Sequence, residues 1–405
     1  MIRVLHVFNP YFGHTFSGHI KRWLRQFHEW NDGSINHLIL MPDSGNILDY
    51  RECELSLKRS SPGFSIDTSR WGQIRWVYWL LWFLASRRGQ YDLIHLHGLD
   101  WGGLVAGPFA KLLQKPCLRE ISQMGNDNPS ILLGESFSGI KIWCYKRCDS
   151  VLCISDALKK DCLINGFEES KPILLINPVN TELFFPHQVL DSKIQIRRML
   201  KLPEKAILIL FVGSIIRRKG VDLLVRAFIS LAKSNPKMTL LLVGPSTKRE
   251  NLGFDESFIK EIHTNIANAG LTERVIFTGQ VDNDRLLADY YHTADLFAFP
   301  TRQEGLGNVI LEAMSAGLPV ISSYLPGITD LLIQDGVNGI LIPPDDVSSL
   351  QEKIQLLLDH PEQGLELGKA ARESSLQNFG FDAWQERLVE IYFSMVESKH
   401  PGSQA

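Results

Sequence analysis

The segment FAFPTRQEGLGNVILEAMSAGLPVISS, residues 297–323, carries the clearest fold signal in the sequence. An apolar strand ends at Pro300, a short loop follows, and Asn308 is placed to cap the helix that comes next. Gly317 stands where a helix commonly ends, and Pro319 prevents the helix from continuing and opens a second apolar run. This order predicts a strand–helix–strand unit of a parallel sheet.

Short apolar runs alternate with helix-length amphipathic segments along the whole chain. The plan of strand, glycine-containing loop and helix begins at Ile2 and begins again at Ala206. Several strands are continuous apolar runs, as expected for strands that helices cover on both faces. The pattern predicts an α/β fold with two doubly wound, Rossmann-like parallel-sheet domains that face a cleft.

A polar connection marked by proline separates the two halves. We place the boundary near Pro186, which gives a first domain of residues 1–186 and a second domain of residues 187–380. The last segment, residues 381–405, has a helical pattern and is expected to cross back to the first domain. Ligands of such sheets bind at the carboxyl ends of the strands, so the loops there are the candidate site.

The composition excludes several classes of protein. The 405 residues are 44% hydrophobic and 21% charged, which is typical of a folded globular chain. A net charge of −3 gives no support for a dedicated nucleic-acid binder. No apolar run has the roughly 20 residues of a membrane span, and no secretory leader pattern is present, so we expect a cytoplasmic protein. The six cysteines lack the spacing of a zinc site.

The loop and helix of the opening segment suit a polar ligand. Gly305 and Gly307 allow the backbone to approach a ligand closely, and the N–H groups at the helix start attract anions. Glu312 is the charged residue of the apolar run VILEAM. A buried carboxylate needs hydrogen-bond donors, which a sugar diol or a neighbouring arginine would supply.

A basic loop follows the first strand of the second half. In FVGSIIRRKGVDLL, Gly213 ends the strand, and Arg217, Arg218 and Lys219 precede a helix. Cations at the carboxyl end of a strand suit a phosphate group, whereas the alternative is a solvated basic turn. The Gly-Lys-Ser/Thr order of a P-loop is absent.

Together these motifs resemble the retaining, nucleotide-sugar-dependent glycosyltransferases of group 1, which have the GT-B fold. The family signature contains two glutamates separated by seven residues around a Gly-x-Gly, and Glu304 and Glu312 match it. The resemblance implies that Glu304 lies beside the donor sugar and that Glu312 holds the ribose hydroxyls. It also implies that four backbone amides contact the sugar or the diphosphate, those of Gly305, Leu306, Gly307 and Asn308.

The resemblance extends to the basic loop. Gly213, Lys219 and Gly220 match the family's donor-binding loop, whereas Ser214 stands where the family usually has an arginine. We expect Arg218 to compensate for that arginine in binding the donor. Gly279, in VIFTGQV, matches the segment whose backbone faces the nucleobase.

The first domain matches the family in outline. Gly18 fits the glycine loop that faces the diphosphate, and His95 and His97 fit a strand that often carries histidine. Asp127 is the titratable group retained from the family's His-Gly-Ser-Asp motif, because Met124 replaces the histidine.

We predict an enzyme that moves a hexose from a nucleotide-diphosphate sugar to a glycan, lipid-linked or small-molecule acceptor with retention of configuration. Glu304 and Asp127 are the candidate catalytic residues. The resemblance implies that no metal is required, and the sequence agrees, because no Asp-x-Asp motif offers itself as a site for a divalent metal and a diphosphate. We expect no cofactor besides the sugar donor. The chemical task is to stabilise a leaving diphosphate and an oxocarbenium-like sugar.

Three alternatives remain. A catalytically silent nucleotide-sugar binder that partners another transferase would explain Ser214 and Met124. A Rossmann dehydrogenase would need a Gly-x-Gly-x-x-Gly after the first strand, which the chain lacks. A sugar-nucleotide epimerase is the third alternative.

The segment RWVYWLLWFLASRR runs from Arg75 to Arg88 and is rich in tryptophan and arginine. Trp and Tyr favour membrane interfaces, and Arg favours anionic lipid heads. The segment therefore predicts either peripheral contact with the inner face of a membrane or a helix that packs on the sheet of the first domain.

Overall fold

The computed structural model describes residues 1–8, 34–41, 56–59, 69–186, 190–247 and 254–399. The chain divides into two compact units. The first unit comprises Met1–Ile176 and Gln385–Ala405, and the second comprises Asn177–Trp384. The boundary lies before the predicted Pro186, because the intervening residues bond to the second unit. For example, the amide of Val179 donates to the carbonyl of Phe379 over 2.9 Å.

The first unit is built on a seven-stranded sheet with the order β3-β2-β1-β4-β5-β6-β7. All of its neighbouring strands are parallel. The strands are β1 (Ile2–Phe8), β2 (Ile35–Met41), β3 (Ser56–Arg59), β4 (Leu93–His97), β5 (Cys117–Ile121), β6 (Ser150–Cys153) and β7 (Pro172–Leu174). Strand order reverses between β1 and β4, which makes that pair the switch point of this sheet.

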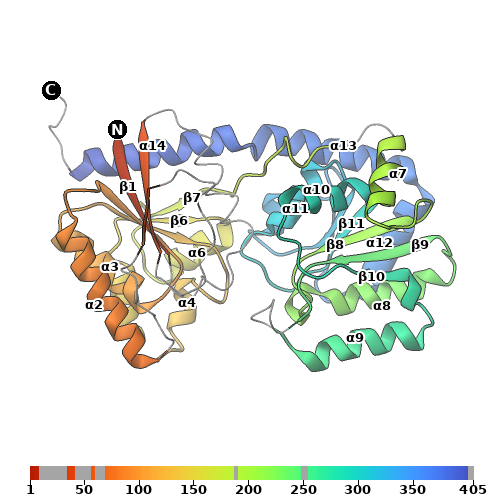
Figure 1. The fold of residues 1–405 in the computed structure, drawn as a ribbon, viewed down its shortest axis with the longest axis horizontal. Coiled ribbons are helices and arrows are strands. Elements are labelled where there is room, and N and C mark those ends of the chain that lie inside the picture. Colours follow the sequence, from red (N-terminus) through yellow and green to blue (C-terminus); the bar gives the residue numbers. More distant parts are fainter. Residues whose placement is uncertain (9–33, 42–55, 60–68, 187–189, 248–253, 400–405) are drawn as a thin grey trace. The chain divides into compact units, whose positions relative to one another are not determined.

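Helices cover both faces of the first sheet (Figure 1). The helices are α2 (Arg70–Ser86), α3 (Trp101–Leu112), α4 (Pro129–Leu132), α5 (Ser138–Tyr145), α6 (Asp156–Ile164) and α14 (Phe381–Lys399). One face of α2 packs into an apolar core with the side chains of alternate strand residues, such as Leu5 and Leu96. Because neighbouring strand residues point to opposite faces, His95 lies on the other face, where its Nδ1 is 2.8 Å from the hydroxyl of Tyr392 on α14.

The second unit repeats this frame with six strands in the order β10-β9-β8-β11-β12-β13. They are β8 (Ile207–Val212), β9 (Met238–Val243), β10 (Val275–Phe277), β11 (Leu296–Phe299), β12 (Val320–Ser323) and β13 (Ile340–Ile342). Every pair of neighbours is parallel. The central strands are buried along their length, as the continuous apolar runs predict. The switch point lies between β8 and β11.

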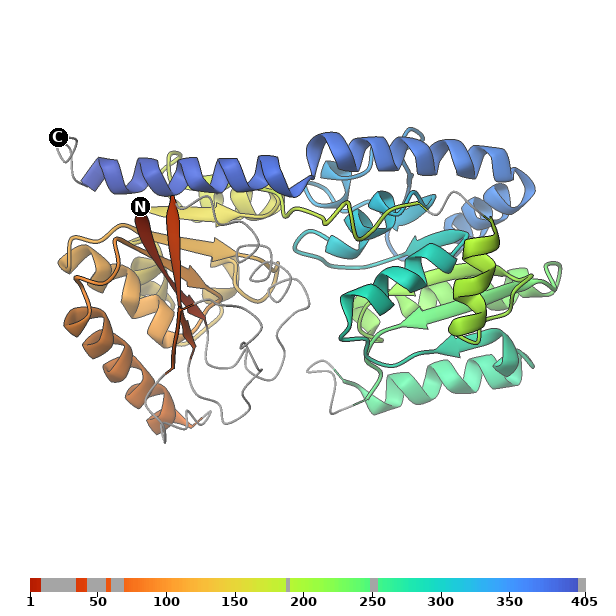
Figure 2. The same ribbon diagram turned by 45° about the horizontal axis from the view of Figure 1, so that its top comes forward.

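The helices of the second unit lie on both faces of its sheet (Figure 2). They are α7 (Leu190–Met199), α8 (Val221–Ala232), α9 (Glu256–Asn268), α10 (Asp284–Thr293), α11 (Asn308–Ser315), α12 (Val347–Asp359) and α13 (Pro361–Asn378). Helix α8 packs beside α12, and α11 packs beside α13. Among the helices that the structure describes, none has the length and hydrophobicity needed to cross a membrane.

Candidate active site

Two loops meet at the switch point of the second unit. The first follows β8 and contains the 3₁₀ turn Arg217–Lys219, and the second follows β11. The amide of Arg302 donates to the carbonyl of Arg218 over 2.9 Å, which fixes one loop against the other. The basic loop and the glutamate loop, predicted from separate motifs, therefore form one site.

Glycine is required where these loops touch. Gly220 has a φ of +71°, and a Cβ there would lie 1.8 Å from the carbonyl oxygen of Pro300. Gly244 follows β9, and its Cβ would lie 2.1 Å from the carbonyl oxygen of Gly213. Any larger residue would force the backbones apart, so the two glycines allow the strand ends to approach closely.

The centre of the site is an ion pair between Lys219 and Glu304. The Nζ atom of Lys219 lies 2.5 Å from Oε1 of Glu304, and both side chains are largely buried. Thr301 donates its hydroxyl to the same carboxylate oxygen over 2.9 Å. Burial lowers the pKa of Lys219, and the nearby Glu304 opposes that shift. Each charge alone would be costly to bury at this place, and the ion pair offsets that cost for both residues.

Arginines support this pair. Nη1 of Arg218 lies 3.8 Å from Oε1 of Glu304 and donates to the carbonyl of Gln303 over 2.6 Å. The guanidinium of Arg302 binds both oxygens of Asp222 on α8, at 2.7 and 2.8 Å. Sequence reasoning missed this Arg302 clamp, because its two members are 80 positions apart in the chain and belong to two separate motifs.

The turn into α11 differs from the prediction in one detail. Gly307, with a φ of +95°, is the residue that precedes the helix, and Asn308 is the first helical residue rather than the cap. The side chain of Asn308 instead accepts a hydrogen bond from Asn177 over 3.2 Å. Leu306 is buried and anchors the loop, while Gly305 belongs to the turn before it.

Glu312 is buried inside α11, and a tyrosine is one of its partners. The hydroxyl of Tyr291, on α10, donates to Oε2 of Glu312 over 2.7 Å. Only 2% of Glu312 is exposed, so this bond offsets part of the cost of burying its carboxylate. The sequence offered no signal for Tyr291, which lies in an amphipathic helix without a motif.

Three glycines line the carboxyl ends of neighbouring strands. Gly213 follows β8 and Gly244 follows β9, while Gly279 lies just beyond β10. The amide of Gly244 donates to the carbonyl of Gly279 over 3.0 Å, and a Cβ at Gly279 would meet nothing within 4 Å. The edge predicted to face a nucleobase is thus made of backbone with open space beside it.

The chain has a single Asp-x-Asp sequence, which sequence reasoning missed. It runs from Asp282 to Asp284 and begins α10. Asn283 caps this helix by accepting from the amide of Leu286 over 2.9 Å. Oδ1 of Asp282 accepts from Gln280 over 2.7 Å. These contacts give the segment a role in starting a helix.

Asp127, the candidate of the first unit, shapes a loop. Its Oδ1 accepts from the amide of Gln123 over 2.8 Å, and its Oδ2 accepts from the amide and hydroxyl of Ser122 over 2.9 Å. Burial raises the pKa of Asp127 to about 6, although these hydrogen bonds oppose the shift. Gly18, the other candidate of this unit, lies outside the described residues.

Comparisons with known proteins identify the kind of enzyme. The model of the family "Glycosyl transferases group 1" matches residues 192–374. D-inositol 3-phosphate glycosyltransferase 1 of Catenulispora acidiphila is 28% identical over 323 residues, which cover 76% of this chain and 73% of that protein. This chain is a glycosyltransferase whose second unit matches group 1 of these enzymes. The enzyme is a transferase that uses a nucleotide sugar, as the sequence predicted.

Other matches agree with this assignment. The GDP-mannose-dependent alpha-(1-6)-phosphatidylinositol monomannoside mannosyltransferase of Mycolicibacterium smegmatis is 27% identical over 228 residues, covering 55% of this chain and 56% of that protein. The structure of Anabaena HepE in complex with UDP and glucose covers 97% of this chain and all of that one. It has a TM-score of 0.76 and 20% identity. This likeness confirms the predicted fold class, two parallel-sheet α/β domains of the GT-B type.

Proposed function

We propose that the loops after β8 and β11 hold the diphosphate and sugar of the donor, and that the enzyme transfers a hexose with retention of configuration. The observation that carries this proposal is the buried pair of Lys219 and Glu304 at the switch point, where doubly wound sheets bind their ligands. The lysine suits the anionic diphosphate of the donor, and the carboxylate suits the hydroxyl groups of its sugar.

The pair also suggests how donor binding prepares the site. In the free enzyme, Glu304 neutralises Lys219. A diphosphate that approaches Lys219 and Arg218 competes for the ammonium group with two negative charges rather than one. Lys219 then turns to the phosphate, and Glu304 is released to accept hydrogen bonds from the sugar. Neither residue needs a metal ion for these contacts, so we propose metal-independent transfer.

The remaining donor contacts follow from the same geometry. Glu312, held by Tyr291, is placed to bind the ribose hydroxyls, and the amides of residues 305–308 can donate to the sugar or phosphate. The open backbone beside Gly279 suits the face of a base. The catalytic role of Asp127 stays a prediction, and its contacts favour a role in holding the loop that contains Gly125.

The test of this proposal is a donor screen. Purified protein is incubated with UDP-, GDP- and ADP-sugars, and its melting temperature and the release of nucleotide are measured. A bound donor at a hundred times its dissociation constant should stabilise the fold by about 2.7 kcal/mol. Transfer to an acceptor followed by NMR of the new anomeric proton tests retention. Binding without any turnover would favour the silent-partner alternative that Ser214 and Met124 suggest.

We also propose that the first unit binds a membrane surface through α2. The helix gives support to both alternatives of the sequence, because its faces differ. Trp76 and Leu80 are buried in the core, whereas Trp71, Tyr78 and Trp82 are 76%, 72% and 61% exposed. The exposed residues recur with helical spacing and form one stripe. One face of α2 therefore packs into the core, and another face is available to contact a membrane.

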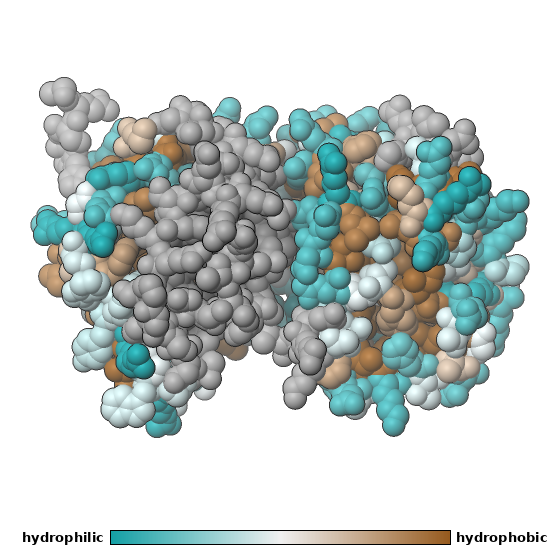
Figure 3. Space-filling model, viewed as in Figure 1, coloured by the Kyte–Doolittle hydropathy of each residue, from teal (hydrophilic) through white to brown (hydrophobic). Residues whose placement is uncertain are grey.

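The charge around this stripe suits anionic lipid. Residues 70–91 contain no Asp or Glu, and four arginines, at 70, 75, 87 and 88, accompany the aromatic residues. Figure 3 shows pale and teal side chains over α2 rather than a brown patch, because Trp and Tyr lie near the middle of the hydropathy scale. Such amphipathic aromatic residues prefer the headgroup region of a bilayer.

Helix α5 also exposes apolar side chains. Helix α3 packs against both α2 and α5, and α5 exposes Ile140 and Trp143, with Phe137 just before it. Arg147 stacks on the ring of Trp143, its guanidinium carbon 4.7 Å from the ring centre. Helices α2 and α5 thus each expose apolar side chains beside cations, which supports a lipid-linked acceptor presented at the bilayer.

Vesicle flotation tests the membrane proposal. Binding to vesicles with phosphatidylglycerol is expected at low salt, with weaker binding at high salt or to neutral vesicles. Replacing Trp71, Tyr78 and Trp82 together by Ala should abolish flotation while leaving donor binding unchanged. Tyr324→Ala, which changes an exposed aromatic residue of the second unit, is the matched control. Flotation of the triple variant at the normal level would contradict the proposal.

A further inference from the structure

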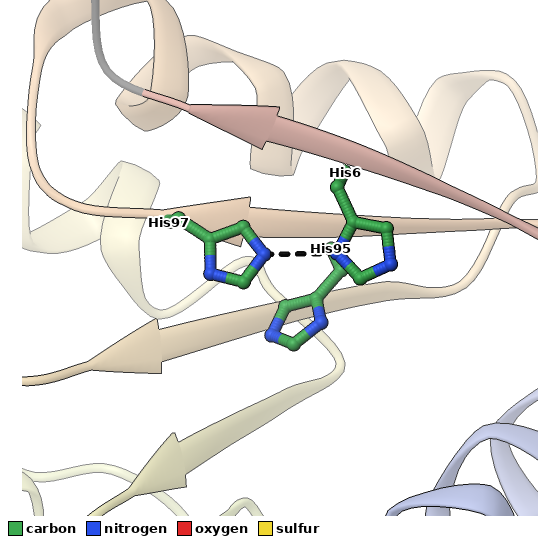
Figure 4. A group of neighbouring side chains, drawn as sticks. All are labelled: His6, His95 and His97. Atoms are coloured by element: carbon green, nitrogen blue, oxygen red, sulfur yellow. Dashed lines mark hydrogen bonds between the residues drawn. The ribbon is translucent and has the colours of Figure 1, made fainter. Parts of the chain in front are cut away.

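A cluster of histidines lies inside the first unit. His6 comes from β1, His37 from β2, and His95 and His97 from β4. The register pairs His6 with His95, so these side chains share the face of the sheet opposite to α2. Figure 4 shows His6, His95 and His97 gathered over the two neighbouring strands. All four residues are buried.

Three of these rings converge. Nδ1 of His6 lies 3.0 Å from Nε2 of His97. One ring nitrogen from each of His6, His95 and His97 lies within 4.8 Å of the other two. Tetrahedral zinc with Zn–N bonds of about 2.0–2.1 Å places its ligand nitrogens about 3.3 Å apart. A small movement of His95 toward the other two rings would therefore complete three corners of such a site.

The outer nitrogen of each ring is held by another group. Nδ1 of His97 lies 2.8 Å from Oε2 of Glu120, on β5. Nε2 of His6 lies 2.9 Å from Nδ1 of His37. Nδ1 of His95 is bonded to the hydroxyl of Tyr392, on α14. Metal-binding histidines are typically oriented in this way, with the nitrogen that does not bind the metal hydrogen-bonded to a carboxylate or another polar group.

The electrostatics of the cluster suit a cation. Burial and the neighbouring imidazoles lower the pKa values of His6 and His95 well below the usual range, so these rings are neutral. Neutral imidazole is the form that binds a metal. Glu120 supplies negative charge, with its Oε2 2.8 Å from His97 and 3.9 Å from Nε2 of His95. That charge reduces the cost of holding a divalent ion in a buried place.

We propose that His6, His95 and His97 bind one divalent transition-metal ion, with zinc the best match to three imidazoles, and that Glu120 orients His97. The ion replaces the hydrogen bond between His6 and His97. The proton of His6 Nδ1 moves to Nε2, and His37 accepts it as a hydrogen bond by changing tautomer, so no net proton is lost. The metal joins β1 to β4 and has a structural role, separate from the donor chemistry of the second unit.

Cobalt provides the direct test. Tag-free protein is stripped with a chelator, transferred to metal-free buffer and titrated with Co²⁺. One equivalent per chain should bind, with visible absorption typical of tetrahedral nitrogen coordination, and Zn²⁺ should displace it. The spectrum should lack the near-ultraviolet band of cobalt bound to thiolate, because the buried cysteines of the first unit are not ligands in this proposal. Absence of binding, or a thiolate band, overturns it.

Variants assign the site. His97→Ala should abolish the Co²⁺ spectrum, and Glu120→Gln should weaken Zn²⁺ affinity about 10–100-fold by removing the group that orients His97. His292→Ala, which changes a buried histidine of the second unit, is the matched control and should bind as the wild type does. Melting temperatures in chelator separate folding from binding, and if His97→Ala does not fold, the volume-conserving Glu120→Gln decides. Unchanged zinc affinity in Glu120→Gln overturns the proposal.

Discussion

At the switch point of the second unit a lysine and a glutamate form a buried ion pair, whereas at that of the first unit three buried histidines lie together. The two sheets have the same parallel frame, with the strand order reversing beside β8 in one and beside β1 in the other. The frame brings strand ends together in both units, and the side chains decide the ligand. A lysine beside a carboxylate can exchange partners, while imidazoles whose outer nitrogens are hydrogen-bonded to other groups are suited to stay in place.

Of the variants considered, Glu304→Gln is expected to reduce the turnover rate the most. Turnover should fall by about 10²–10³-fold, because the variant loses a carboxylate placed where charge develops on the sugar. Nucleoside diphosphate affinity should stay the same or increase, since Lys219 no longer has a competing carboxylate. Steady-state kinetics and calorimetric titration measure the two effects. A normal kcat would contradict the role of Glu304, and a comparison of melting temperatures controls for folding.

Lys219→Ala should weaken binding of the nucleoside diphosphate. Loss of one charge-assisted contact typically costs about 1.5–3 kcal/mol, which corresponds to roughly 10–100-fold in affinity. The neighbouring Arg217 provides the control, because it is exposed and paired with Glu261 at 2.9 Å. Arg217→Ala should bind the nucleotide normally in the same titration. If the two variants bind equally well, the phosphates lie elsewhere.

Glu312→Gln is expected to have a smaller effect, mainly on the KM for the donor. A group that binds ribose acts on the ground state and the transition state alike, so kcat should change little. A rise of about 5–10-fold in KM corresponds to roughly 1–1.4 kcal/mol, which is the net contribution of one ordinary hydrogen bond. Tyr291→Phe removes the hydroxyl that holds Glu312 and should shift KM in the same direction. A change in stability alone, with KM untouched, would make Glu312 a purely structural residue.

Removal of Mg²⁺ and Mn²⁺ should have the smallest effect on turnover. The proposed donor site uses Lys219, Arg218 and backbone amides, so activity in EDTA should match activity with added Mg²⁺. If activity is lost in EDTA, the metal that restores it shows which of the two units needs a metal. Recovery with Zn²⁺ alone would point to the histidine cluster of the first unit, whereas recovery with Mg²⁺ or Mn²⁺ would contradict metal-independent transfer.

Helices, strands and motifs could be predicted from the sequence better than contacts between residues distant in the chain. The strand, loop and helix around Gly307 could be expected from local signals, because proline, glycine and apolar spacing act within a few residues. The contact of Lys219 with Glu304 joins residues 85 positions apart, and no local signal encodes it. His95 and His97 were noticed one by one, but their meeting with His6 depends on the register of β1 and β4.

Helix α14 has a consequence for how the protein is made. It begins at Phe381 in the second unit, yet from Gln385 onward it belongs to the first, where Tyr392 contacts His95 and Lys399 pairs with Asp149 at 2.9 Å. The ribosome therefore delivers the N-terminal sheet long before the helix that covers its histidine face. The first unit can therefore start to fold first, but it is completed only after α14 has been translated.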